Sequence, residues 1–223
     1  MLTTITSQDV QATQSSGLDT RFIKHTIPHI DQAHAKNPLI SHLIDPALSF
    51  SQKIHGPTRM MGDNSHLIQG SLKSGNGYRF DAEAAPAHLC GDYLLRAEMS
   101  VTLPASPRPS QTAYYDQLER LGWVVNRFAP VVDGYGRVAE NERLVDGSIR
   151  DSILAAADDT DCQSIVLFGA DGAFTRAVKY ARRCGKDVFV CSWANTLHPE
   201  LAAACTSHIS LETLRPLILR AYH

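Results

Sequence analysis

The segment from Ile165 to Phe174 constrains the fold of this chain more than any other. Its sequence, IVLFGADGAF, starts with four consecutive apolar residues and continues with an aspartate between two glycines. A short run that is apolar at every position predicts a strand buried on both faces, as in a parallel sheet. Asp171 then stands at the carboxyl end of this strand, where open α/β sheets bind ligands. It is either a turn residue that starts the next helix or a metal ligand, since Asp and Gly also favour turns.

Segments with strand and helix character alternate along most of the chain. Such alternation predicts an α/β fold with a central, mostly parallel sheet. The hydrophobic fraction of 43% is sufficient for its core. Strands are predicted at 59–62, 93–103, 123–125, 164–168 and 187–192, helices at 66–72, 111–121, 145–157 and 174–184, a loop at 129–142, and a closing helix followed by a short strand at 208–211.

The chain is predicted to divide after Pro57. Residues 1–57 form an N-terminal extension, polar at first and then with short apolar clusters interrupted by Pro38 and Pro46. Such a segment predicts flexible or helical pieces, an arm that packs on the main domain, on a second copy or on another protein partner. Residues 58–223 are predicted to be one domain, of a length typical for such a unit.

Composition excludes several classes of protein. A net charge of -2 argues against a strongly basic binder of duplex DNA, although local basic patches stay open. The sequence has no apolar run of about 18 residues and its first residues lack a signal-peptide pattern, so we expect no membrane span and a cytoplasmic location. The five cysteines show no paired ligand spacing and the ten histidines are scattered, which argues against zinc and fits a reducing compartment.

Two further aspartates are candidates for the same edge of the sheet. Asp63 follows a predicted strand and precedes a helix, although Asn64 and Ser65 beside it also favour a turn or a helix cap. Asp146 either caps the helix that begins after it or lies on that helix, in which case it is within about 60° of the apolar Ile149 position.

Asp151 lies about 140° from Asp146 around the same predicted helix. We therefore rank it as a supporting ligand beside the three main candidates Asp63, Asp146 and Asp171. Three carboxylates that meet at one sheet edge repel one another unless a cation joins them, and oxygen ligands suit Mg²⁺ or Mn²⁺. Such ions promote phosphodiester hydrolysis by activating water and stabilising charge on a phosphate oxygen.

Three blocks carrying these acids, MGDNS at 61–65, RLVD at 143–146 and LFGADGAF at 167–174, resemble the NYN domain family of the PIN-like ribonuclease superfamily. The similarity covers about residues 58–212, and includes GKDVFV at 185–190. It implies a three-layer α/β sandwich with a central, mostly parallel sheet of the PIN-like or Rossmann-like type. It also implies a divalent-metal-dependent endoribonuclease in which Asp63, Asp146 and Asp171 hold the metal, and whose products carry a 5′-phosphate and a 3′-hydroxyl.

The chain departs from the family pattern at three positions. Ala173 stands where the family usually has a second acid, His66 where it usually has Asn, and Thr206 near the position of a closing Asp. A catalytically weakened or inactive scaffold that binds RNA or a protein is therefore the main alternative. A phosphatase with Asp63 as nucleophile is a lesser one, because Ser65 replaces the second Asp that this chemistry commonly uses.

Contacts with RNA are predicted from polar and basic residues near these blocks. Arg176 and Lys179 lie on one stripe of the predicted helix at 174–184, which is either a solvated face or a phosphate contact. Trp123 and Trp193 are either core residues or stacking platforms for bases. The other candidate RNA contacts are Asn64, Ser65 and Arg143.

Overall fold

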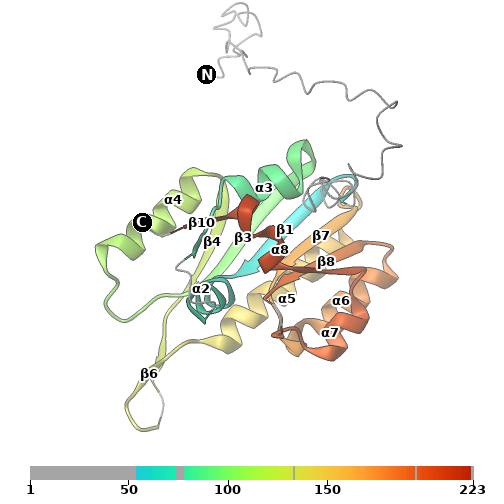
Figure 1. The fold of residues 1–223 in the computed structure, drawn as a ribbon. Coiled ribbons are helices and arrows are strands. Elements are labelled where there is room, and N and C mark those ends of the chain that lie inside the picture. Colours follow the sequence, from blue (N-terminus) through green and yellow to red (C-terminus); the bar gives the residue numbers. More distant parts are fainter. Residues whose placement is uncertain (1–53, 74–77, 133, 194, 222–223) are drawn as a thin grey trace, which may run out of the picture. The chain divides into compact units, whose positions relative to one another are not determined.

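The centre of the fold is a six-stranded parallel sheet with the strand order β4-β3-β1-β7-β8-β9 (Figure 1). The computed structural model describes residues 54–73, 78–132, 134–193 and 195–221, which belong to one unit. The predicted α/β fold with a central parallel sheet is confirmed. The strands of this sheet are β1 (Thr58–Asp63), β3 (Leu94–Thr102), β4 (Trp123–Phe128), β7 (Ser164–Phe168), β8 (Asp187–Ser192) and β9 (Ser207–Ser210).

The direction in which the sheet is built reverses beside β1. From β1 the chain proceeds outward through β3 to the edge strand β4, then crosses back to β7 on the other side of β1, and continues to β9. Doubly wound sheets bind ligands in the crevice that such a reversal opens at the carboxyl ends of the strands. The carboxyl ends of β1 and β7 are therefore the place where this fold favours a site.

Helices cover both faces of the sheet and bury two separate apolar cores. Alternation along a strand sends neighbouring residues to opposite faces, so Met60 packs in one core and Met61 in the other. One face carries α2 (Asn64–Lys73), α3 (Ala84–Leu89), α4 (Pro109–Arg120) and α8 (Leu211–Ile218). The other face carries α5 (Glu142–Asp158), α6 (Thr175–Arg183) and α7 (Pro199–Ala204).

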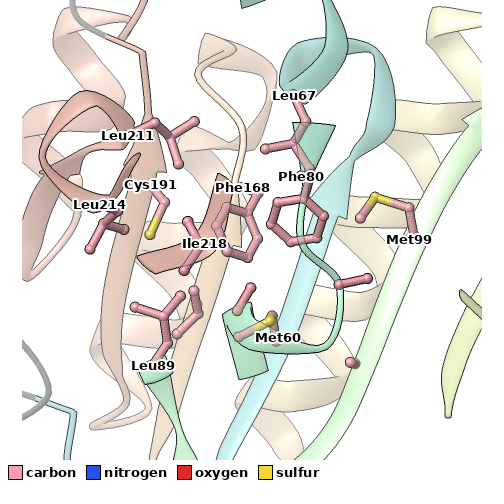
Figure 2. Packing of buried hydrophobic residues seen from close by; sticks show 14 of the residues in the cluster. Met60, Leu67, Phe80, Leu89, Met99, Phe168, Cys191, Leu211, Leu214 and Ile218 are labelled. Atoms are coloured by element: carbon pink, nitrogen blue, oxygen red, sulfur yellow. The ribbon is translucent and has the colours of Figure 1, made fainter. Parts of the chain in front are cut away.

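The first core joins residues far apart in the sequence (Figure 2). Phe80 makes edge-to-face contacts with Phe168 of β7 and with Trp123 of β4, at centroid distances of 5.3 and 5.9 Å. Phe80 lies in the short strand β2 (Tyr78–Phe80), which pairs antiparallel with β10 (Leu219–Ala221). This pairing ties the end of the described chain to the layer beside α2.

Several boundaries differ from those that the sequence predicts. The helix predicted at 145–157 starts earlier, at Glu142, because the side chain of Asn141 caps it. The predicted loop at 129–142 contains a small antiparallel hairpin of β5 (Val131–Val132) and β6 (Val138–Ala139). Helix α8 and strand β10 follow the strand predicted to close the domain, which is β9. The extension predicted at 1–57 lies outside the described residues, apart from residues 54–57.

Candidate active site

The three main predicted aspartates line one cavity of about 520 Å³ at the carboxyl ends of β1 and β7. Asp63 is the last residue of β1, Asp171 follows β7, and Asp146 lies on α5. The reversal of the sheet therefore brings together three acids that the sequence separates by up to 108 positions. The other residues that line this acidic cavity are Ser65, His66, Gln69, Glu140, Glu142, Ala170, Gly172, Phe174, Thr196, Leu197, His198 and Pro199.

Asp63 is held by the start of the helix that follows it. Its Oδ1 accepts a hydrogen bond from the backbone N–H of Ser65 at 2.8 Å, which satisfies one free donor of α2. Burial raises the pKa of Asp63 from 3.8 to about 6. Backbone hydrogen bonds oppose this shift, while the negative charges of Asp146 and Glu140 add to it by smaller amounts. The capping role and a role in the site are thus compatible, since the same rotamer serves both.

Asp171 has the turn geometry that its sequence context predicts. It caps the short 3-10 helix η3 (Gly172–Phe174), and its Oδ1 accepts a hydrogen bond from the N–H of Ala173 at 2.7 Å. Phe174 is buried in the second core and anchors this turn. The carboxylate of Asp171 is exposed and lines the acidic cavity.

Asp146 does not cap a helix. The N-cap of α5 is Asn141, and Asp146 lies in the second turn, next to the buried Val145 and one turn before the buried Ile149. Burial raises the pKa of Asp146, and the negative charge of Asp171 raises it further, while Arg150 opposes both. Asp146 therefore faces another carboxylate rather than a helix terminus.

Asp151 is not brought to this site. It is exposed on the same helix but lines a different cavity of about 620 Å³, together with Arg59, Arg96 and Glu98. The Asp151 position is rotated away from the site because α5 presents a second stripe of residues toward β3 and β4. The structure thus separates Asp151 from the three main aspartates.

Two further carboxylates, Glu140 and Glu142, line the acidic cavity and escaped the sequence analysis. They flank the cap residue Asn141. Glu142 lies in the first turn of α5, where the helix dipole stabilises a negative charge. An Asn followed by an acid is a helix-start signal that would have placed them near Asp146. With them, five acids line the cavity, and none of its described lining residues is Lys or Arg.

Two histidines complete the polar lining of the cavity. Burial lowers the pKa of His66 to about 4, so its imidazole is neutral near pH 7. Its Nε2 is buried and has no hydrogen-bond partner among the described residues. His198 accepts a hydrogen bond at Nδ1 from the N–H of Glu200 at 3.3 Å, and its backbone N–H donates to the Ala170 carbonyl at 2.9 Å.

The donor set matches a hard divalent cation in its chemistry. Carboxylate oxygens are the ligands that Mg²⁺ and Mn²⁺ prefer, and repulsion between neighbouring carboxylates favours a cation between them. Within the described part of the chain, however, no group of three or more His, Cys, Asp or Glu side chains is arranged to hold a metal ion directly. Mg²⁺ commonly keeps several waters and binds through only one or two carboxylates, so direct coordination by three side chains is not required for this ion.

Of the predicted RNA contacts, only Ser65 lines the acidic cavity. Asn64 is buried and its Oδ1 accepts a hydrogen bond from Tyr114 Oη at 3.3 Å, while Ser65 lines the cavity. The predicted basic contacts Arg143, Arg176 and Lys179 are exposed and do not line the cavity.

Both tryptophans are core residues. The indole N–H of Trp123 donates to the Ala82 carbonyl at 2.9 Å, and that of Trp193 donates to the His66 carbonyl at 3.1 Å. Both rings are buried, so they are not exposed platforms for bases. Across the described residues, we find no helix with the length and apolarity that a membrane span requires.

Comparison with known proteins supports the fold. No family model matches the chain, and no curated protein matches it. Among solved structures it is similar to the crystal structure of a protein of unknown function from Vibrio parahaemolyticus, with a TM-score of 0.57 and 17% sequence identity. The match covers 76% of this chain and 99% of that chain. At this identity the similarity concerns the α/β fold alone.

Proposed function

We propose that this protein is a metal-dependent endoribonuclease of the NYN type. The observation that carries the proposal is the convergence of Asp63, Asp146 and Asp171 on one cavity at the reversal point of the sheet. The blocks that carry these acids are those that resemble the NYN family. Mg²⁺ or Mn²⁺ is the proposed cofactor and RNA the proposed substrate.

The need for a cation follows from the charge of the cavity. A phosphodiester is an anion, and a cavity whose described lining includes five carboxylates and no Lys or Arg repels it. Bound in the cavity, Mg²⁺ or Mn²⁺ would supply a Lewis acid that activates water and stabilises charge on a phosphate oxygen. Asp63, Asp146 and Asp171 are the residues proposed to hold this ion.

The protein's own groups contribute orientation. The hydrogen bonds from Ser65 N–H to Asp63 and from Ala173 N–H to Asp171 fix two of the carboxylates before substrate binds. Fixed acceptors reduce the reorganisation needed in the transition state. Because Nδ1 of His198 accepts a hydrogen bond, its Nε2 carries the proton of the neutral ring and is a donor at the rim of the cavity.

Cleavage of labelled single-stranded RNA tests the proposal. We expect cleavage with Mg²⁺ or Mn²⁺, none with chelator, and products with a 5′-phosphate and a 3′-hydroxyl. Asp171→Asn and Asp146→Asn should lower the rate by about 100-fold or more, because each removes a charge from the site. Asp151→Asn is the matched control, since it lies on the same helix as Asp146 but lines another cavity.

Two outcomes would contradict the proposal in different ways. No cleavage of RNA by the wild-type protein with either metal would refute the nuclease activity. Cleavage that survives in Asp146→Asn but is lost in Asp151→Asn would place the reaction in the other cavity. Retained folding of each variant is checked by circular dichroism and by thermal unfolding.

A non-catalytic scaffold is the second candidate. It is favoured by Ala173, which replaces an acid usual in the family. It is also favoured by the lack, among the described residues, of a group of three or more His, Cys, Asp or Glu side chains arranged to hold a metal ion. A scaffold would bind RNA or a protein equally well in chelator and would show no metal-dependent thermal stabilisation. An increase in melting temperature with Mn²⁺ that Asp146→Asn abolishes would exclude it.

We also infer a cytoplasmic location. The five cysteines are free thiols, and Cys90, Cys162 and Cys191 are buried. Free thiols persist in reducing compartments. Labelling of the cysteines with a thiol reagent after unfolding of protein taken directly from cells should find all five reduced.

A further inference from the structure

The β5–β6 hairpin lies outside both cores and extends away from the sheet (Figure 1). Val132 and Val138 pair directly across its two strands, with exposed fractions of 66% and 56%. Tyr135, in the turn between the strands, is 87% exposed. A two-stranded hairpin without packing is marginally stable in water, and apolar residues grouped on a surface mark interaction sites. The hairpin is therefore a candidate binding element.

The hairpin starts at the rim of the acidic cavity. Glu140, directly after β6, lines that cavity and also a neighbouring one of about 320 Å³. Ser65 and Gln69 line both cavities as well, and Val138 of the hairpin lines the second. The lining is thus continuous from Asp171 to the hairpin.

The second cavity differs from the acidic one in its charge. Glu140 is the only Asp, Glu, Lys or Arg among its described lining residues, and Gln69, Thr102 and Gln111 supply uncharged polar groups. Uncharged polar and apolar groups suit nucleobases, which bind by stacking and by hydrogen bonds from their edges.

The turn of the hairpin presents an aromatic ring together with a cation. The guanidinium of Arg137 lies over the ring of Tyr135, 5.2 Å from its centroid. Aromatic rings on which bases stack, combined with Arg beside the backbone, are typical of proteins that bind single-stranded nucleic acid. A second copy of this chain is a poorer occupant, because a stable dimer needs about 800 Å² and 20–30 residues on each partner.

We infer that the β5–β6 hairpin is a binding arm for single-stranded RNA, which holds nucleotides beside the one cleaved in the acidic cavity. The inference rests on the proposed function and identifies where the substrate strand lies. Tyr135 stacks on a base, Arg137 approaches the phosphate backbone, and the strand continues past Val138 and Glu140 toward Asp171.

The test separates binding from cleavage. Fluorescence anisotropy measures the affinity of a labelled single-stranded RNA in chelator, in the Asp171→Asn background, so that no strand is cut. Tyr135→Ala should weaken binding by roughly 5- to 100-fold, the range for loss of one stacked base, while Tyr135→Phe should bind as the parent does. Arg137→Ala should lower the slope of log affinity against log salt by about 0.7. Tyr93→Ala, at an exposed tyrosine just before the amino end of β3, is the matched control and should leave affinity unchanged.

Each alternative result has a definite meaning. Equal affinity of Tyr135→Ala and the parent, or no RNA binding by the parent, would refute the inference that the hairpin binds single-stranded RNA. A change from dimer to monomer in Tyr135→Ala, measured by light scattering without a change in RNA affinity, would overturn it in favour of self-association. RNA binding that depends on Tyr135, in a protein that does not cut RNA, would support the hairpin as an RNA-binding arm and refute only the proposed nuclease activity.

Discussion

The imidazole of His198 packs directly on the backbone of Gly172: a Cβ built at Gly172 would lie 2.9 Å from both Cγ and Nδ1 of the ring. This approach requires glycine, since real Cβ atoms essentially never come so close to another heavy atom. Gly172 follows Asp171, so the contact fixes an imidazole beside a proposed metal ligand.

Gly172→Ala should therefore displace the His198 ring from the rim of the acidic cavity. Because His198 is exposed, the ring can move outward, and we expect the free energy of unfolding to fall by less than about 1 kcal/mol. Cleavage should fall by roughly tenfold or more, since small displacements of groups in a site have large effects on rate. The ring position is followed by the NMR shift of the His198 Cε1–H. Wild-type cleavage with a shifted resonance would show that this contact has no part in the reaction.

Two glycines inside helices should respond in opposite ways to the same substitution. At Gly70 in α2, an added Cβ would lie 1.8 Å from Cδ1 of the buried Trp193, so Gly70→Ala should destabilise by about 1–3 kcal/mol or more through overpacking. At Gly147 in α5 the nearest atom is 3.8 Å away, on Arg150, so Gly147→Ala should stabilise by up to about 1 kcal/mol. Urea unfolding measures both, and a Gly70→Ala variant as stable as wild type or more stable would contradict the packing of Trp193 on α2.

The α/β fold and the positions of the three main acids can be predicted from the sequence because the signals for them are local. A buried apolar strand followed by turn and cap residues indicates a strand-to-helix step. Asp63 and Asp171 stand at such steps, and the structure places both at the carboxyl ends of parallel strands. Glu142 could have been found from the helix-start signal of Asn141 before it, whereas the position of Glu140 depends on the hairpin before α5, whose short strands have no periodicity to detect. Asp151 lines another cavity, in agreement with its predicted angle of about 140° from Asp146 around the helix, and this angle argues against its ranking as a supporting ligand.

Asp63 should make stability depend on pH. Its pKa in the folded protein is about 6, against 3.8 for an unperturbed Asp, so the folded state binds this proton more tightly than the unfolded state. This contribution is favourable below about pH 4 and is lost as pH rises from about 4 to 6. Asp63→Asn should therefore be more stable than wild type above pH 6, by up to roughly 3 kcal/mol, and equal to it below pH 4.

Urea unfolding of both proteins at each pH isolates this contribution, because all other groups are shared. Chelator must be present, since a cation bound by Asp63 would stabilise the wild type alone. An Asn variant that is less stable than wild type at pH 7 would show that Asp63 is charged at little cost, in contradiction to its burial.

Lys186 should stabilise the connection between α5 and β7 although it lies far from the acidic cavity. It is buried, and its Nζ donates to the carbonyls of Asp159 and Cys162, at 2.5 and 2.7 Å. Lys186→Met keeps the aliphatic volume but leaves both carbonyls without this donor, so we expect a loss of about 2–4 kcal/mol in the free energy of unfolding. Lys179→Met, at an exposed position on α6, should change stability by less than about 0.5 kcal/mol. Equal urea midpoints for the two variants would mean that water replaces the ammonium group at both carbonyls, and that burial of Lys186 contributes nothing to the fold.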